Sequence, residues 1–253
     1  MSLHTYNVDE IVTILKGTNI PTVLVEGKDD INIFRLIEER AAYSVKEINI
    51  IPCGGKETLF NVYKRKNEFP SKKVVFLADR DMNLFEDRTK HLKEIIWTKG
   101  YCIENDIFAG SKCLLNELLD SKERSEFKTT IKEICRWFAF EVEKYLRNEE
   151  FNVQYSIYKI CKDHPSKLCS KFLMEIGFRD PGGELINDII LNYKFKLRGK
   201  QIFQVLERIL ISERRYSRFS KENLIEMAIK LNQKNIYINN LIKKISSVLD
   251  SIN

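Results

Sequence analysis

Carboxylates follow three short apolar stretches in the first half of the sequence. Glu26 follows PTVLV with Asp30 four residues later, Asp79 and Asp81 follow VVFLA, and Glu104 follows GYCI. Oxygen ligands from Asp and Glu, with neither His nor Cys in the set, favour Mg²⁺ or Mn²⁺ over zinc. Close carboxylates repel one another, and a divalent cation removes that cost. The five side chains are therefore candidate ligands of a Mg²⁺ or Mn²⁺ site.

Parallel strands are expected to carry these carboxylates. Short apolar runs predict strands at 21–27, 47–55, 74–81 and 94–105, with helices at 29–42 and about 56–68 between them. Such alternation indicates βαβ units and a mostly parallel sheet of the α/β class. Ligands of open α/β sheets bind beyond the carboxyl ends of the strands. The acidic side chains are expected to converge there.

The spacing of the acids supports a shared site. The period of two along a strand predicts that Asp79 and Asp81 point to the same side. Glu26 and Asp30 are four apart and share a face if the helix begins between them. The ordinary alternative is that an Asp after a strand forms a turn or caps the next helix. A single acidic residue after a strand would be interpreted as such a turn or cap. Three acidic strand ends, which include a D-x-D and an E-x-x-x-D, favour the metal site.

The chain changes character near residue 110. Beyond about 107 the apolar spacing is nearly all helical, with breaks at 164–167 and 179–183. We expect an α/β core with an N-terminal helix over 1–110, a helical insertion over 111–184, and a C-terminal helical region over 185–253 that completes the active site. With 253 residues and 43% apolar content, the chain has ample material for such a core.

Positive charge is concentrated in the second half. Residues 1–110 carry a net charge of −1 and residues 111–253 a net charge of +7, and a basic surface attracts nucleic acid. Cations alternate with aromatic residues in NYKFKLRGK and ERRYSRFSK, and one Lys follows a Gly-Gly turn; the candidate nucleic-acid contacts are Lys56, Lys194, Lys196, Arg198, Arg214, Arg215 and Arg218. The alternative is that the aromatic residues belong to the core and the cations beside them are solvated, which would produce the same sequence pattern. For Lys56, a role at a helix start is equally consistent with the sequence.

Nothing in the sequence predicts a membrane protein. It has no apolar run of spanning length, and its start is acidic and helical rather than signal-like, so we expect a cytoplasmic protein. The six cysteines form no CxxC pair and are expected to be reduced.

Four motifs together resemble the TOPRIM domain shared by topoisomerases, primases and OLD-type nucleases. VEGKDD, PCGGKETL, FLADRD and GYCIEN occur in the family's order over about residues 21–110. Glu26 matches the family's Glu after the first strand, and Asp79 and Asp81 match its D-x-D. The nuclease branch adds an acid one turn after that Glu, matched by Asp30, and a Glu-Asn, matched by Glu104 and Asn105. It also adds a distant Lys, for which Lys200 in LRGKQIFQVL is the candidate.

The resemblance implies a four-stranded, mostly parallel TOPRIM sheet flanked by helices, and hydrolysis of phosphodiester bonds with two Mg²⁺ or Mn²⁺ ions. Asp79, Asp81 and Glu104 would bind metal, Glu26 and Asp30 would hold the second ion or position the attacking water, and Lys200 would offset charge on the phosphate. Without the resemblance, Lys200 would be read as an ordinary exposed Lys at a helix start.

With its compact size and the Gly-Lys near its end, the chain most resembles the stand-alone TOPRIM effectors of PARIS-type phage-defence systems. That resemblance implies a toxic endonuclease controlled by an ABC-type ATPase, active as a homodimer, with tRNA favoured over DNA. GGKET lacks the Walker spacing, so ATP-driven control would come from the partner. The alternative function is a catalytically silent TOPRIM module that binds its ATPase partner or senses a phage protein, and so regulates the ATPase.

Overall fold

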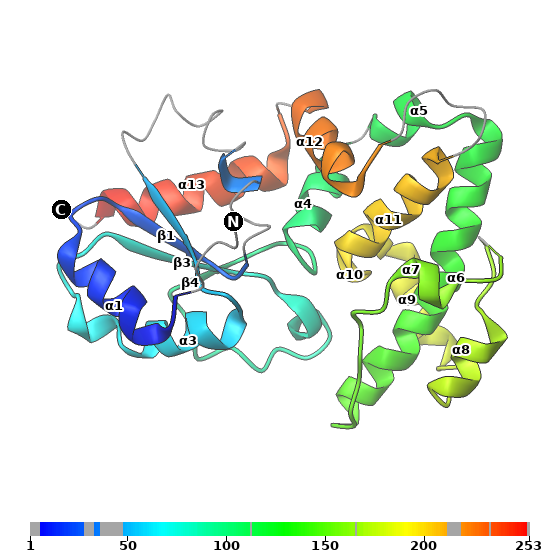
Figure 1. Ribbon diagram of the computed structural model, residues 1–253, viewed down its shortest axis with the longest axis horizontal. Coiled ribbons are helices and arrows are strands. Elements are labelled where there is room, and N and C mark those ends of the chain that lie inside the picture. Colours follow the sequence, from blue (N-terminus) through cyan, green and yellow to red (C-terminus); the bar gives the residue numbers. More distant parts are fainter. Residues whose placement is uncertain are drawn as a thin grey trace. The chain divides into compact units, whose positions relative to one another are not determined.

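The computed structural model of the protein describes residues 6–27, 33–35, 48–111, 113–164, 166–211, 219–232 and 234–251 (Figure 1). The chain forms two compact units. The first comprises Met1–Asp79, Lys90–Thr98 and Ile236–Asn253, and the second comprises Arg80–Thr89 and Lys99–Asn235. The chain therefore passes between the units several times.

The described part of the first unit contains a four-stranded parallel sheet. Its strands are β1 (Thr22–Val25), β2 (Asn49–Pro52), β3 (Val74–Ala78) and β4 (Ile95–Trp97), in the order β2-β1-β3-β4. The predicted α/β class and parallel sheet are confirmed. Of the helix predicted at 29–42, only residues 33–35 are described, and they are helical.

The fourth predicted strand is wrong over most of its length. β4 ends at Trp97, and helix α4 (Ile103–Gly110) begins within the stretch predicted as strand. The Asp106 carboxylate accepts the N–H groups of Lys99 and Gly100, which fixes the turn after the strand. The Asn105 side chain accepts the Cys102 N–H at the start of α4. Glu104 therefore lies in the first turn of a helix and not at a strand end.

Helices cover both faces of the sheet. α1 (Val8–Gly17) and α3 (Lys56–Lys64, followed by the 3₁₀ turn η1, Lys66–Glu68) pack on one face, and α13 (Ile236–Ser251) contacts β3 and β4 from the other (Figure 1). Ile11 and Leu15 of α1, Leu59 of α3 and Phe76 of β3 share one apolar cluster. The sequence groups α13 with the C-terminal helical region, whereas it belongs to the unit that contains the sheet.

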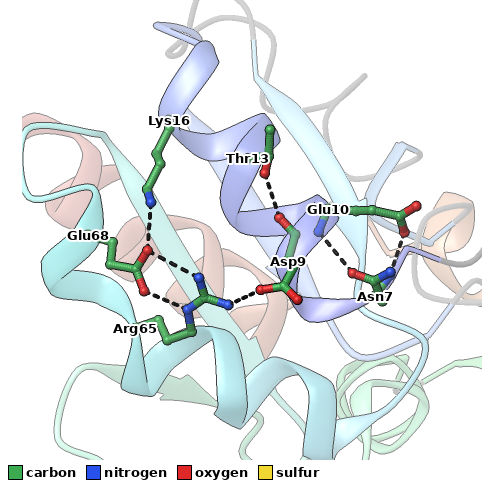
Figure 2. Close-up of polar contacts among 7 residues, drawn as sticks. All are labelled: Asn7, Asp9, Glu10, Thr13, Lys16, Arg65 and Glu68. Carbon is green, nitrogen blue, oxygen red and sulfur yellow. Dashed lines mark hydrogen bonds and ion pairs between the residues drawn. The ribbon is translucent and has the colours of Figure 1, made fainter.

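Polar contacts fix α1 against the C-terminal end of α3. Arg65, which follows α3, pairs with Asp9 of α1 and with Glu68, and Lys16 of α1 also pairs with Glu68 (Figure 2). Asn7 caps α1 by accepting the Glu10 N–H at 3.0 Å. These contacts hold α1 and α3 side by side on the sheet.

The second unit is helical where it is described. Its longest described helix, α6 (Ser121–Leu146), contacts α9 (Gly183–Leu191) and α11 (Gly199–Leu210). The remaining described helical segments are η2 (Asp81–Leu84), α4, α5 (Leu114–Leu118), α7 (Ile157–Ile160), α8 (Ser170–Glu175), α10 (Tyr193–Lys196) and α12 (Lys221–Leu231). The predicted breaks at 164–167 and 179–183 fall on either side of α8.

Aromatic side chains fill the core of the second unit. Phe108 of α4 packs against Phe127 of α6, Tyr193 of α10 and Phe203 of α11.

Within the described ranges, no helix is both long and apolar enough to cross a membrane. All six cysteines are free thiols.

Candidate active site

Glu26 and Asp79 lie together at the carboxyl ends of two neighbouring strands. The Asp79 N–H donates to Glu26 Oε1 at 2.7 Å, immediately after β3 and β1 respectively. β1 lies between β2 and β3, so the strand order reverses at this pair. In open α/β sheets, this reversal is where ligands usually bind. The sheet therefore brings two of the predicted carboxylate residues to a customary ligand position.

Lys56 supplies positive charge to the same group. It is the first residue of α3 and follows Gly54 and Gly55, whose φ angles of 77° and 149° favour glycine. Its Nζ donates to the Asp79 carbonyl at 2.6 Å and lies 3.5 Å from Glu26 Oε1. The sequence was equally consistent with two roles for Lys56, a contact with phosphate or a position at the start of a helix. The residue does begin a helix, and its ammonium is a counter-charge for Glu26.

Cys53 lies close to this carboxylate and remains a thiol. Burial raises its pKa to about 12, and the negative charge of Glu26 acts in the same direction. The thiolate is the nucleophilic form of cysteine. Cys53 is therefore a packing residue beside Glu26 and not a nucleophile.

Asp81 has an unusual backbone conformation in the second unit. Its φ is 51°, in the left-handed region, and its N–H donates to the Tyr101 carbonyl at 2.8 Å. β3 ends at Ala78 and Asp81 begins η2, so the prediction that a strand period aligns Asp79 with Asp81 is wrong. Left-handed conformations of residues other than glycine are costly and cluster at functional sites. The conformation supports a functional interpretation of Asp81.

Glu104 and Lys200 lie side by side although they are far apart in the sequence. Lys200, the second residue of α11, places its Nζ 3.8 Å from Glu104 Oε1. The Glu104 side chain is only 2% exposed, and its Oε2 has no hydrogen-bond partner among the described residues. A buried polar atom without a partner calls for an explanation such as a bound water or ion.

Asn105 joins α4 to the segment that leads into α11. Its side chain is buried, donates to the Lys194 and Leu197 carbonyls, and accepts the Gly199 N–H. The sequence marked Asn105 only through the Glu-Asn resemblance. Its contacts with 194–199 cannot be read from spacing because they join distant segments.

Asp106 was missed by the sequence analysis. Burial raises the pKa of its carboxyl to about 6, although the N–H groups of Lys99 and Gly100 and the charges of Lys99 and Arg80 favour the charged form. An acidic residue in the first turn of a helix is a recognisable start signal. That signal was available in the sequence and would have shortened the fourth predicted strand.

Apart from Lys56, the predicted basic contacts differ in their surroundings. Lys196 pairs with Asp188, Lys194 is exposed, and Arg198 is half-buried just before α11. Tyr193 packs in the aromatic core. For this residue, the alternation of aromatic and basic residues in NYKFKLRGK therefore reflects core packing rather than a base-stacking platform. The other predicted contacts, Arg214, Arg215 and Arg218, lie outside the described residues, as does the candidate ligand Asp30.

The available oxygens suit a hard divalent cation. Within the described ranges, no three His, Cys, Asp or Glu side chains gather closely enough to hold a metal ion. The carboxylates of Glu26 and Asp79 nevertheless follow adjacent strands, and Glu104 Oε2 is buried without a partner in the described part of the chain. Carboxylate oxygens are the ligands that Mg²⁺ and Mn²⁺ prefer. The chemistry of these donors therefore fits the predicted metal.

Comparisons with known proteins do not identify the chain. No protein-family model matches the sequence, and no curated protein matches it. The functional assignment therefore depends on the residues themselves.

Proposed function

We propose that the protein is a metal-dependent endonuclease that hydrolyses phosphodiester bonds in nucleic acid. The observation that carries this assignment is the pairing of Lys200 with buried Glu104. Motif resemblance assigned both residues to one active site, and the 3.8 Å separation of their charged atoms supports that assignment. Two features add independent support: Glu104 Oε2 has no hydrogen-bond partner among the described residues, and Asp81 has a left-handed backbone; both carry an energetic cost in the folded protein.

The acidic side chains have the role of holding the cation. As the motif resemblance implies, the residues proposed to hold it are Glu26, Asp30, Asp79, Asp81 and Glu104. Of these, Glu26 directly follows β1 and Asp79 directly follows β3. When bound, Mg²⁺ or Mn²⁺ supplies Lewis-acid stabilisation of the phosphoryl oxygens.

The cationic side chains have the role of neutralising the substrate. The Lys200 ammonium, held beside Glu104, would stabilise the negative charge that builds on the phosphate during cleavage. Exposed Lys194 and half-buried Arg198 lie on the same segment and would contact the substrate backbone. Lys56 would offset the charge of Glu26.

Substrate and control follow from the TOPRIM resemblance. In this proposal tRNA is favoured over DNA as the substrate, and an ABC-type ATPase of the same phage-defence system restrains the enzyme. The active form is a homodimer in the cytoplasm that uses two metal ions. The basic second half of the sequence is consistent with a nucleic-acid substrate.

A cleavage assay tests the assignment directly. Purified protein is incubated with total tRNA, single-stranded RNA or plasmid DNA in the presence of Mg²⁺, Mn²⁺ or EDTA. We expect metal-dependent cleavage that is lost in Glu26→Gln and Asp79→Asn, falls to a measurable residual rate in Lys200→Met, and is retained in Glu150→Gln, a matched change at an exposed position.

Two results would contradict this function. Cleavage at the wild-type rate in all three site variants would show that the nuclease activity lies elsewhere or comes from a contaminant. No cleavage by the folded protein, even with an activated ATPase partner, would favour the silent binding or sensor module.

A further inference from the structure

The side chain of Asn105 uses its full hydrogen-bonding capacity within the second unit. Its Nδ2 donates to the Lys194 carbonyl at 2.8 Å and to the Leu197 carbonyl at 2.7 Å. Its Oδ1 accepts the Cys102 N–H at 3.1 Å and the Gly199 N–H at 2.9 Å. An amide has two donor hydrogens and two acceptor lone pairs, and all four are occupied here. The side chain thus links the start of α4 to the segment 194–199.

Gly199 permits this close approach. A Cβ atom at Gly199 would lie 2.7 Å from the Asn105 backbone nitrogen, 2.8 Å from its Oδ1 and 2.9 Å from the Glu104 Cβ. Cβ atoms essentially never approach other heavy atoms so closely. The first residue of α11 must therefore lack a side chain for α11 to begin beside Glu104.

A second backbone contact holds the same segment. The Tyr101 N–H donates to the Phe195 carbonyl at 2.7 Å, and the Tyr101 carbonyl accepts the Asp81 N–H. Phe195 lies between the residues whose carbonyls Asn105 binds. The segment 194–199 is therefore fixed from two sides, by Tyr101 and by Asn105.

We propose that Asn105 is a positioning residue, which together with Gly199 sets the start of α11 and so holds the Lys200 ammonium beside Glu104. Lys200 directly follows Gly199, so its backbone position is determined by the Asn105 contact. The expected effect of this positioning on catalysis rests on the proposed nuclease function. The expected effect on the position of the Lys200 side chain is independent of that function.

The first experiment measures Lys200 without any enzymatic readout. Reductive methylation followed by mass spectrometry gives the labelling rate of Lys200 relative to that of Lys122, an exposed residue of α6, in the same molecule. Gly199→Ala keeps every hydrogen-bonding group of Asn105 but forces the helix start away. Its matched control is Gly183→Ala, at the first residue of α9, where a Cβ meets nothing within 4 Å.

We expect Gly199→Ala to raise the relative labelling rate of Lys200 severalfold while Gly183→Ala leaves it unchanged. An unchanged rate in a folded Gly199→Ala variant would overturn the positioning role, whether or not the protein is a nuclease.

The second experiment asks whether Asn105 acts through Lys200. Asn105→Asp keeps the side-chain volume but turns an oxygen toward two carbonyl oxygens. On the substrate cleaved by the wild type, we expect kcat to fall about tenfold to a hundredfold with KM within about twofold, as for a catalytic group displaced by about 1 Å. In a Lys200→Met background the same substitution is expected to cost no further activity.

The double-variant result separates positioning from general damage. Equal losses of kcat in both backgrounds would mean that Asn105 serves only the fold, and would overturn the inference. Gly199→Ala is carried through the same cycle, so the question is decided even where Asn105→Asp fails to fold. Absence of cleavage by the wild type would refute the proposed function but leave the labelling experiment intact.

Discussion

The left-handed conformation of Asp81 makes a quantitative prediction about stability. Asp81→Ala and Asp81→Gly both remove the carboxylate, so their difference isolates the cost of a φ of 51°. A residue with a Cβ pays about 1–2 kcal/mol in this region. Glycine loses about 0.4–1 kcal/mol more conformational entropy on folding. The glycine variant is therefore expected to be more stable by about 1 kcal/mol.

Thermal unfolding measures this difference. For a chain of this size, about 1 kcal/mol corresponds to a melting temperature about 2–4 °C higher for Asp81→Gly than for Asp81→Ala. Asn148 provides the reference, because it has a φ of 57° after the end of α6 and no proposed catalytic role. Asn148→Gly and Asn148→Ala should show the same order of stability with cleavage intact, whereas both Asp81 variants should be inactive.

One outcome would refute the reasoning. If Asp81→Ala melts at or above the temperature of Asp81→Gly while the two Asn148 variants follow the expected order, the backbone at Asp81 is not strained. The left-handed conformation would then give no support to a functional role for Asp81.

Three further predictions concern other charged groups. Burial raises the pKa of Glu141, so its native carboxyl keeps its proton to a higher pH than the unfolded one. The free energy of unfolding should fall as pH rises from about 4.3 through the raised native value, and urea unfolding at several pH values should show a smaller fall in Glu141→Gln. Arg65→Met removes ion pairs between largely solvent-accessible groups and should lower the melting temperature only slightly, with a smaller effect at high salt. Lys56→Met removes the cation beside Glu26, so Mn²⁺ should raise the melting temperature at lower concentrations than in the wild type.

Each of these has a clear contrary result. An unchanged pH profile in Glu141→Gln would show that this carboxyl is not the group that titrates. A loss from Arg65→Met that persists at high salt would point to packing of the Arg65 stem rather than to its charge. A Mn²⁺ response of Lys56→Met identical to that of the wild type would mean that Lys56 and the metal do not compete.

Much of the first unit could be predicted from the sequence. The runs before Glu26 and Asp79 are short and, apart from Thr22, apolar, as expected for strands covered on both faces, and both are strands. The predicted N-terminal helix is present as α1, and α3 begins at Lys56, where the helix at about 56–68 is predicted to start. Local periodicity was sufficient because the two helices each bury one face and the two strands are buried on both faces.

The sequence analysis was wrong where side chains redirect the backbone. Tyr101, Cys102 and Ile103 form an apolar run that is compatible with strand or helix, and short runs of this kind are ambiguous. The choice is made by Asp106, which binds the preceding turn, and by Asn105, which caps the helix. Contacts between α4 and the start of α11 were equally out of reach, since they depend on tertiary packing across distant segments.

The chain order gives α13 a special place in biosynthesis. The ribosome completes the strands of the sheet first and must then translate Lys99–Asn235 before α13 is made. At about 5–20 residues per second, this interval lasts roughly 7–27 s. Throughout it, the surface of β3 and β4 that α13 contacts lacks this helix and is accessible to chaperones and to aggregation. The α/β unit, although it begins the chain, is therefore expected to finish folding last, and truncations that remove α13 should damage the sheet while sparing the helical unit.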